Sequence, residues 1–275
     1  MIASDLSKEL DVAIRLARQA AASIMDYYPT NVAVDYKAGN EPVTAADRVA
    51  DEIISHGLRQ HFPHDGLLSE ESADDPLRLD RRRVWIVDPL DGTADFIDRT
   101  DDFAVQIALT LDGRPVLGVV YQPVQDLLFY AVQGQGAHVV HGDEHGQLHV
   151  SAVSDPGRMC LVASRSHFST FIQAAQHALG IERVQKAGGV GVKIGLLARG
   201  ACDLYLATKV CKEWDLCAPH AVLQEAGGTF TNLFGQPLTY NRAGVQECHG
   251  LAASNGQAHG RILEALAPLR DGMDW

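Results

Sequence analysis

The chain lacks the features that mark membrane, secreted and disulfide-rich proteins. No apolar run approaches the roughly 18 residues that a membrane span needs, and residues 1–5 lead into a charged amphipathic stretch rather than a signal peptide. Its five cysteines form no Cys-x-x-Cys pair, and an odd number suits free thiols in a reducing compartment. We therefore expect a cytoplasmic protein with no membrane partner.

Positive charge is also scarce. The chain has 23 Lys and Arg against 35 Asp and Glu, which gives a net charge of −12 at pH 7. Because a nucleic-acid interface needs clustered Lys and Arg, we expect no nucleic acid polymer as a partner. An acidic enzyme that binds an anionic substrate would need metal ions or local cations.

The apolar pattern before residue 150 predicts two helices packed on an antiparallel meander. Helical spacing covers about residues 6–27, and a second helix should begin after Thr44. A short apolar run and strict alternation predict strands, at Val84–Asp88, Phe103–Leu111, Val116–Tyr121 and Leu127–Val132.

Strands and helices alternate after residue 150, which predicts an α/β layer. We expect strands at Leu161–Ser164 and Asp203–Ala207, and helices at Phe168–Leu179, Val190–Ala198 and Leu216–Ala226. The change in pattern divides the chain into an N-terminal α+β subdomain over 1–150 and a C-terminal α/β subdomain over 151–275.

Two further patterns are weak. His141, His145 and His149 repeat every four residues, but the turn-rich sequence around them predicts a solvated hairpin tip rather than a helical metal site. The glycines near Gly189 do not fit Gly-x-Gly-x-x-Gly, and Val184–Gly188 lacks the pattern of a good strand. We therefore expect no dinucleotide-binding site.

Two aspartates, at the end of the predicted strand Val84–Asp88 and just after it, are the strongest indication of a functional site. Asp88 ends the strand, Pro89 should stop the hydrogen-bond ladder, and Asp91 follows across a tight turn. Neighbouring carboxylates repel each other unless a cation lies between them, and hard divalent ions prefer such oxygen ligands. The alternative is an ordinary turn with two solvated aspartates.

The residues after Asp91 favour the metal hypothesis. Gly92 and Thr93 offer backbone N–H groups and a hydroxyl at the predicted start of a helix, where an anion such as phosphate binds. A phosphate ester on this cradle would complete the coordination of a divalent ion.

Three other acidic sites stand out, and two of them have simple structural alternatives. Glu70 and Glu71 follow a short apolar run. Asp215 stands where it could cap the helix expected from Leu216, and Asp47 could complete a capping box with Thr44. Capping and metal ligation can coexist in one carboxylate, so both roles stay open.

In their order and spacing, four motifs resemble those of the magnesium-dependent, lithium-sensitive phosphatases of the inositol monophosphatase superfamily. The resemblance covers the chain from Lys37 to about Tyr240. It rests on Pro42–Asp47, Ser69–Ser72, Asp88–Thr93 and Trp214-Asp215 with Gly227-Gly228. It implies a layered α-β-α-β-α sandwich and a phosphomonoesterase, as a monomer or homodimer.

The resemblance also implies residue roles. Two or three Mg²⁺ ions would be held by Glu70, Asp88, Asp91, Asp215 and the carbonyl of Leu90, with Asp47 near a third, weaker site. A metal-activated water, positioned by Glu70 and Thr93, would attack phosphorus, so the expected catalytic residues are Glu70, Thr93 and Asp47. The transferred phosphate would contact Glu70, Leu90, Asp91, Gly92, Thr93 and Asp215.

Within the superfamily the chain most resembles the 3'(2'),5'-bisphosphate nucleotidases, which convert adenosine 3',5'-bisphosphate to AMP. A second phosphate needs additional cations, which Arg165, His167 and Lys193 would supply; surface solvation is the alternative for Arg165 and Lys193. Inositol phosphate remains the alternative substrate. Glu213 resembles the acidic residue that inositol monophosphatases place on a ring hydroxyl, and Gly189 stands where many relatives have serine. A regulatory binding protein that keeps the fold but has lost catalysis is disfavoured, because a suitable residue stands at every expected metal-ligand position.

Overall fold

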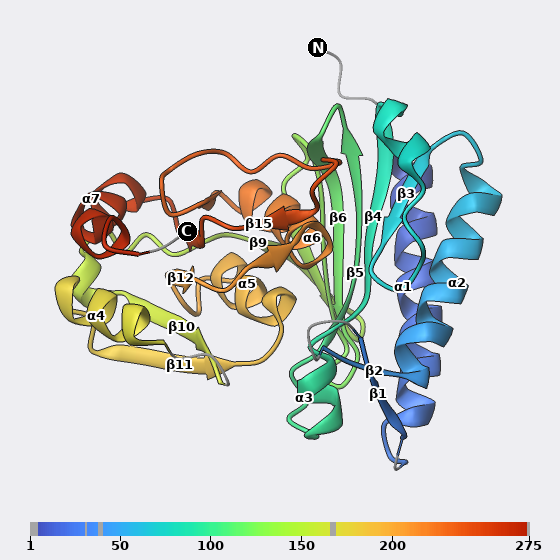
Figure 1. Ribbon diagram of the computed structural model, residues 1–275, viewed down its shortest axis with the longest axis horizontal. Coiled ribbons are helices and arrows are strands. Elements are labelled where there is room, and N and C mark those ends of the chain that lie inside the picture. Colours follow the sequence, from blue (N-terminus) through green and yellow to red (C-terminus); the bar gives the residue numbers. More distant parts are fainter. Residues whose placement is uncertain (1–4, 31, 38–40, 166–168, 274–275) are drawn as a thin grey trace.

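Five layers of helices and sheets make up the protein (Figure 1). The computed structural model describes residues 5–30, 32–37, 41–165 and 169–273. Within these ranges no helix is both long and apolar enough to cross a membrane. The layers run helices, seven-stranded sheet, helices, five-stranded sheet, helices, which confirms the α-β-α-β-α sandwich.

The first layer consists of two long helices that pack side by side on one face of the larger sheet. Helix α1 spans Ser7–Tyr27 and α2 spans Ala45–His61, as the apolar spacing predicts. A short hairpin, β1 (Val34–Tyr36) and β2 (Pro42–Thr44), leads into α2. The side chain of Thr44 accepts the N–H of Ala46 and so caps α2 at its first residue.

The seven-stranded sheet follows sequence order. Its strands are β3 (Gly66–Ser69), β4 (Arg83–Asp91), β5 (Ala104–Leu111), β6 (Arg114–Gln122), β7 (Leu127–Val132), β8 (Ala137–His141) and β9 (Glu144–Leu148). Strand β3 runs parallel to β4, and every later neighbour is antiparallel. The short helices η1 (Pro76–Asp80) and α3 (Thr93–Ile97) flank β4 in the chain. The predicted meander is therefore confirmed.

Strands β8 and β9 form the hairpin predicted around the histidine repeat. His141 pairs with Glu144 across its turn, and His141, His145 and His149 are all exposed. No helix brings the three imidazoles onto one face, as the turn-rich sequence indicates.

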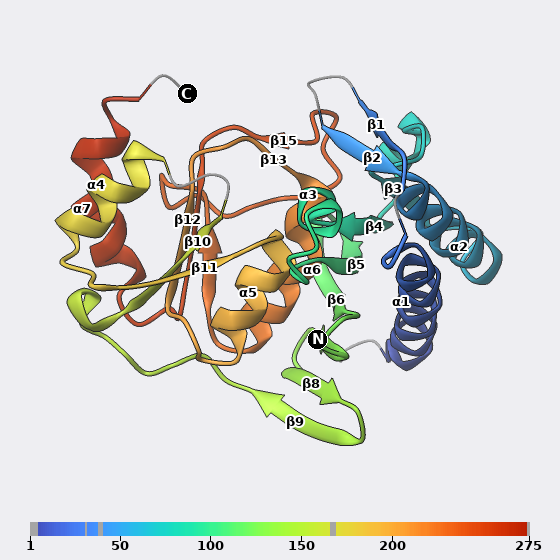
Figure 2. The same ribbon diagram turned by 90° about the horizontal axis from the view of Figure 1, so that it is seen from below.

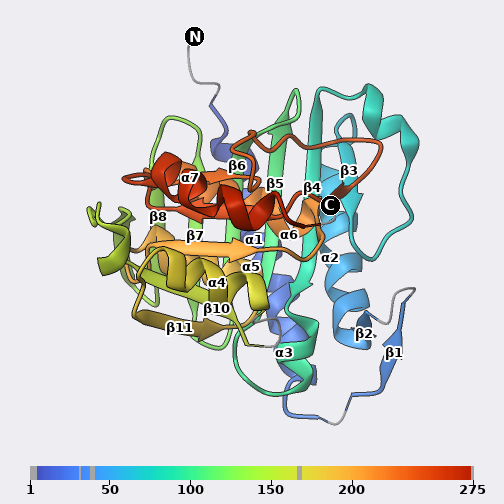
Figure 3. The same cartoon turned by 60° about the vertical axis from the view of Figure 1, so that its left-hand side comes forward.

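The second sheet has the order β11-β10-β12-β16-β14. Figure 2 labels three of its strands, β10, β11 and β12. Its strands are β10 (Cys160–Ser164), β11 (Arg183–Ala187), β12 (Leu204–Ala207), β14 (Thr229–Thr231) and β16 (Leu251–Ser254). Helices α4 (Thr170–Ala178) and α7 (His259–Arg270) cover its outer face (Figure 3). A small pair, β13 (Cys211–Lys212) with β15 (Gln246–Glu247), and the turn η2 (Pro156–Arg158) lie outside both sheets.

Helices α5 (Val190–Ala198) and α6 (Glu213–Glu225) form the middle layer. A single cluster of buried apolar side chains joins the two sheets through them, with Ile86 and Val120 on one sheet, Tyr205 on the other, and Leu197 and Val222 between. The middle layer therefore fixes the two sheets relative to each other.

Three expectations for the part of the chain after residue 150 are wrong. The segment 183–187 is an edge strand, with a mostly exposed surface that hides its pattern. Helix α4 begins at Thr170; Phe168, expected to begin it, lies outside the described residues. Helix α6 begins three residues before Leu216, so Asp215 lies in its first turn and Pro219 in its interior.

Close packing of α6 on β6 depends on a glycine. A Cβ atom added to Gly118 would lie 2.5 Å from the carbonyl oxygen of Ala218 and 2.8 Å from the Cβ of Ala221. Backbone atoms of a buried helix cannot move away as a flexible side chain can, so position 118 fixes how closely the middle layer approaches the sheet.

We expect Gly118→Ala to lower the free energy of unfolding by about 1–3 kcal/mol, because overpacking forces α6 away from the sheet. Gly146→Ala is the matched control, since its added Cβ would lie an ordinary 3.5 Å from Cγ1 of Val139. Urea unfolding of both variants measures the difference. Equal stabilities would contradict the role assigned to Gly118.

Candidate active site

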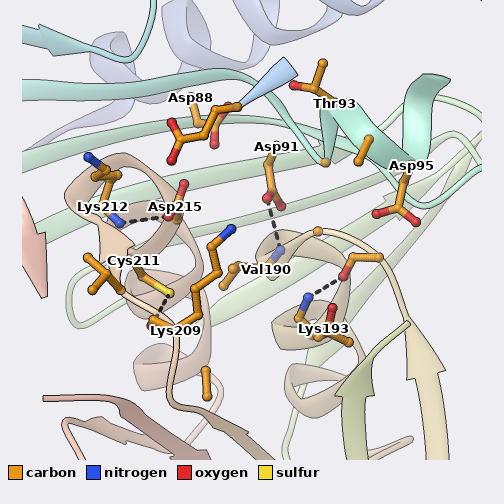
Figure 4. Close-up of a pocket in the computed structure, with 18 of the residues that line it drawn as sticks. Asp88, Asp91, Thr93, Asp95, Val190, Lys193, Lys209, Cys211, Lys212 and Asp215 are labelled. Carbon is orange, nitrogen blue, oxygen red and sulfur yellow. Dashed lines mark hydrogen bonds between the residues drawn. The ribbon is translucent and has the colours of Figure 1, made fainter. Parts of the chain in front are cut away.

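A cavity of about 550 Å³ lies where β3 and β4 meet the first turns of α5 and α6 (Figure 4). Its wall contains most of the residues that the motifs single out. Those residues are Glu70, Asp88, Leu90, Asp91, Gly92, Thr93, Lys193 and Asp215. Segments more than 140 residues apart in the chain thus contribute to one site.

Parallel pairing of β3 and β4 brings Glu70 next to Asp88. The N–H of Glu70 donates to the carbonyl of Val87 (3.2 Å), so both strands deliver a carboxylate to the same edge of the sheet. Asp88 is buried, and its Oδ1 accepts the N–H of Leu90 (3.0 Å).

Strand β4 does not end at Asp88 as expected. It continues to Asp91, which pairs with Ala104, through an irregular register between Asp88 and Asp91 that contains Pro89. A bulge tolerates a residue without an N–H donor, so the proline distorts the ladder without ending it. Gly92 follows in a left-handed conformation (φ 94°), which glycine adopts without strain.

The first turn of α5 holds the Asp91 carboxylate. Asp91 accepts backbone N–H groups from Val190 (3.0 Å) and Gly191 (2.6 Å). A side chain at Gly189 would collide with this carboxylate, which explains why glycine stands at 189 here.

Asp47 makes the capping contact with Thr44 that the sequence predicts, and a second contact with Thr93. Its Oδ2 accepts the N–H and the hydroxyl of Thr44 (2.8 and 2.7 Å), which completes the capping box of α2. Its Oδ1 accepts the hydroxyl of Thr93 (2.8 Å), which also lies 3.3 Å from the carbonyl oxygen of Leu90. A structural cap therefore also orients a hydroxyl in the cavity wall.

Asp215 reaches back along its own helix. It is the third residue of α6, and its Oδ2 accepts the N–H of Lys212 (2.8 Å). The carboxylate therefore caps the first turn from inside the helix rather than from the position before it, and the helix start holds it in the cavity wall.

Burial raises the pKa of four carboxylates, those of Glu70, Asp88, Asp91 and Asp215, and neighbouring carboxylates add to the effect. The pKa of Asp88 is raised well above its usual value by burial and by the charges of Glu70, Asp91 and Asp215. Burial raises the pKa of Asp215 to about 7, and also raises those of Glu70 and Asp91. Negative charge at this site is thus under-compensated by the protein.

Lys37 compensates part of this charge at the edge of the site. Its ammonium donates to Glu70 (2.9 Å) and to Glu71. Burial nevertheless raises the pKa of Glu71 to about 6.

The donor set fits a divalent cation. Carboxylate and carbonyl oxygens are the ligands that Mg²⁺ prefers, and a cation would relieve the repulsion. In the described part of the chain, however, no three His, Cys, Asp or Glu side chains are already arranged around one point. Asp91 and Asp215 accept backbone N–H groups and still keep lone pairs for an ion, so gathering them around one ion requires their side chains to reorient.

The expected phosphate-binding cations have different positions. Lys193 lines the cavity, is 4% exposed, and donates to the carbonyl of Gly188. The guanidinium of Arg165 instead pairs with Asp102 (2.6 Å) and approaches Asp95 (3.5 Å), and Arg165 is absent from the cavity wall. His167 lies outside the described residues.

Two lysines of the cavity wall escaped the sequence analysis. Lys209 points toward the gap between Asp91 and Asp215 (Figure 4). The ammonium of Lys212 lies 6.0 Å from the ring centre of Trp214. Their position in the sequence, just before the Trp214-Asp215 motif, could have indicated them. Residues that directly precede a helix can lie in the same cavity wall as residues of its first turn.

Glu213 is turned away from the cavity. Its carboxylate accepts the N–H groups of Asn241 (2.6 Å) and Arg242 (3.0 Å), and it pairs with the guanidinium of Arg242 (3.1 Å). It is not among the lining residues. Both carboxylate oxygens of Glu213 therefore already accept hydrogen bonds from Asn241 and Arg242.

The sequence profile of the inositol monophosphatase family matches residues 5–270. The 3'(2'),5'-bisphosphate nucleotidase CysQ of Escherichia coli K12 is 38% identical over 236 residues, which cover 84% of this chain and 93% of the relative. Its counterpart from Aggregatibacter actinomycetemcomitans is 34% identical, over 83% and 86%.

Solved structures agree. CysQ from Bacteroides thetaiotaomicron superimposes with a TM-score of 0.77 at 32% identity, covering 91% of this chain and 97% of that one. The inositol monophosphatase from Anabaena gives 0.79 at 27% identity, covering 96% and 97%.

The raised carboxylate pKa values predict how stability depends on pH. Because the folded protein keeps protons on Asp215 up to about pH 7 that the unfolded chain releases near pH 4, metal-free protein should lose stability as the pH rises between these values. We expect the Tm in chelator to fall between about pH 5.5 and pH 8, and saturating Mg²⁺ to restore it most at pH 8.

Asp215→Asn is the control for this effect, since the amide carries no proton to lose. Its Tm in chelator should vary less with pH than that of the wild type. A wild-type Tm that rises from pH 5.5 to 8 without metal would contradict the electrostatic account.

Proposed function

Since the chain belongs to the inositol monophosphatase family, we propose that it is a Mg²⁺-dependent phosphomonoesterase that hydrolyses adenosine 3',5'-bisphosphate to AMP and phosphate. The observation that carries the proposal is the cavity in which four mutually repelling carboxylates, two buried and two half-buried, adjoin the Gly92-Thr93 turn and a buried lysine. Relatives at 31–38% identity over most of the chain are 3'(2'),5'-bisphosphate nucleotidases.

The acidic residues would hold two or three ions. Glu70, Asp88, Asp91, Asp215 and the carbonyl of Leu90 supply the oxygen ligands, with Asp47 beside them. When bound, the ions would lower the pKa of the attacking water and offset charge on the leaving oxygen.

Thr93 would orient the attacking water together with Glu70. Because its hydroxyl donates to Asp47 (2.8 Å), the Thr93 oxygen keeps a lone pair with which to accept a hydrogen bond from water. Asp47 stays fixed by Thr44, so the proton on Thr93 has a defined direction. Thr93 therefore acts as a positioned acceptor, and Asp47 as the group that sets its orientation.

The substrate carries a second phosphate, for which Lys193 is the proposed partner. Lys193 lines the cavity. Its ammonium donates to the carbonyl of Gly188, lies 5.4 Å from the ring centre of Tyr205 and pairs with no described carboxylate within 4 Å. Lys209, which points toward the carboxylates, would face the transferred phosphate instead. Arg165 is a weaker candidate because Asp102 already neutralises it.

The inositol alternative loses its main support. Glu213, the residue expected to hold a ring hydroxyl, is occupied by Asn241 and Arg242 and does not line the cavity. A polyol ring would have to find its hydrogen-bonding groups elsewhere in the wall. The position of Glu213 therefore favours the nucleotide substrate.

We expect Lys193→Met to lower kcat/KM for adenosine 3',5'-bisphosphate by about 10- to 150-fold, the value of a charge-assisted hydrogen bond of about 1.5–3 kcal/mol. The same variant should change kcat/KM for inositol 1-phosphate much less, because that substrate has no second phosphate. Phosphate release measured on both substrates tests the prediction.

Two controls complete the experiment. Arg165→Met should affect both substrates little, and Asp91→Asn should abolish most activity on both by removing a metal ligand. Equal losses on the two substrates in Lys193→Met would overturn the assignment of Lys193. A wild type that prefers inositol 1-phosphate would overturn the nucleotidase assignment.

A further inference from the structure

Gln106 is a buried polar side chain that the proposed function does not use. It lies in the middle of β5 with 0% of its surface exposed. Among the described residues, neither its Nε2 nor its Oε1 has a hydrogen-bond partner. Burying both ends of an amide without partners costs stability, so such a group in a sheet needs an explanation.

The sheet register places Gln106 beside the carboxylates. It is the cross-strand partner of Asp88, and side chains of such pairs lie on the same face. Its neighbours Val105 and Ile107 pack toward α1 and α2, whereas Ala104 and Ala108 pack toward the middle layer. The Gln106 amide therefore lies under the start of α5, on the cavity side of the sheet.

The start of α5 also places the Gln106 amide near Asp91. A Cβ atom built on Gly191 would lie 3.3 Å from Gln106 Nε2 and 3.2 Å from Asp91 Oδ2. Both groups thus border the same backbone atom. Because Gly191 has no side chain, the Gln106 amide can lie close to the Asp91 carboxylate, which accepts hydrogen bonds from the α5 backbone.

We expect ion binding to reorient the Asp91 side chain, because the described carboxylates are not yet gathered around one point. Asp91 now accepts the N–H groups of Val190 and Gly191, and no ready-made ligand group exists among the described residues. An Asp91 oxygen that turns into the cavity toward a cation would lengthen or lose its bond to the α5 backbone. A neighbouring donor that can replace the lost bond would fix the new orientation of the carboxylate.

We propose that Gln106 is a positioning residue that donates to Asp91 when Asp91 leaves the α5 backbone to bind a divalent ion. The inference rests on the proposed function, because it assigns Asp91 to the metal site. It also explains why the fold retains an unsatisfied amide: the group costs stability without metal and serves the loaded site.

The test compares Gln106→Met with the wild type. Methionine has nearly the same shape but no hydrogen-bonding amide, so the variant should melt about 2–4 °C higher in chelator. Its affinity for Mn²⁺, measured by titration calorimetry on metal-free protein, should fall about 10- to 100-fold. A gain in stability with a loss of metal affinity is not expected of a purely structural residue.

Thr110→Val is the matched control. Thr110 is on the same strand and face, is equally buried, and donates its hydroxyl to the carbonyl of Val84 (3.0 Å). Its loss should lower the Tm and leave Mn²⁺ affinity unchanged.

Unchanged Mn²⁺ affinity in Gln106→Met would overturn the proposal, whether the Tm rises or falls. A wild type that does not bind Mn²⁺ would contradict both this inference and the proposed function. A wild type that binds Mn²⁺ but releases no phosphate would contradict the proposed function alone, and the two affinities would still decide the role of Gln106.

Discussion

Repulsion among buried carboxylates is the constraint on which the rest of the site depends. Glu70, Asp88, Asp91 and Asp215 share one cavity wall, and burial raises the pKa of each. Backbone N–H groups and Lys37 compensate only part of their charge. Without metal, repulsion between these groups lowers the stability of the fold. A divalent cation relieves the repulsion, and a phosphate ester can then complete the coordination of the cation.

The layered architecture is what brings the carboxylates together. Parallel β3 and β4 end at the same edge, and the bulge in β4 lets Asp88 and Asp91 both face the middle layer. The first turn of α5 holds Asp91, and α6 carries Asp215 in its own first turn. Glycines at 118 and 191 allow these elements to pack closely, and this packing keeps the carboxylates near one another.

Apolar periodicity predicted most of the helices and strands, because it depends on local sequence. The five layers and the acidic wall join distant segments, and they were predicted only through the resemblance of the motifs to a known family. Edge strand β11 was missed since most of its side chains face solvent and show no alternation. The position of Arg165 depends on Asp102, more than 60 residues away, which no local pattern records. Gln106 was invisible because the alternation of β5 marks only the apolar residues on the other face of the strand.

The central claim is that the acidic cavity is a divalent cation site. Anomalous scattering from crystals soaked in Mn²⁺ tests it directly, because the peak positions locate the ion among the side chains. The account predicts at least one strong peak within coordination distance of Asp88, Asp91 and Asp215, with Asp91 turned away from the backbone of α5. Peaks elsewhere on the protein, with these carboxylates unchanged and without a bound ion, would contradict it.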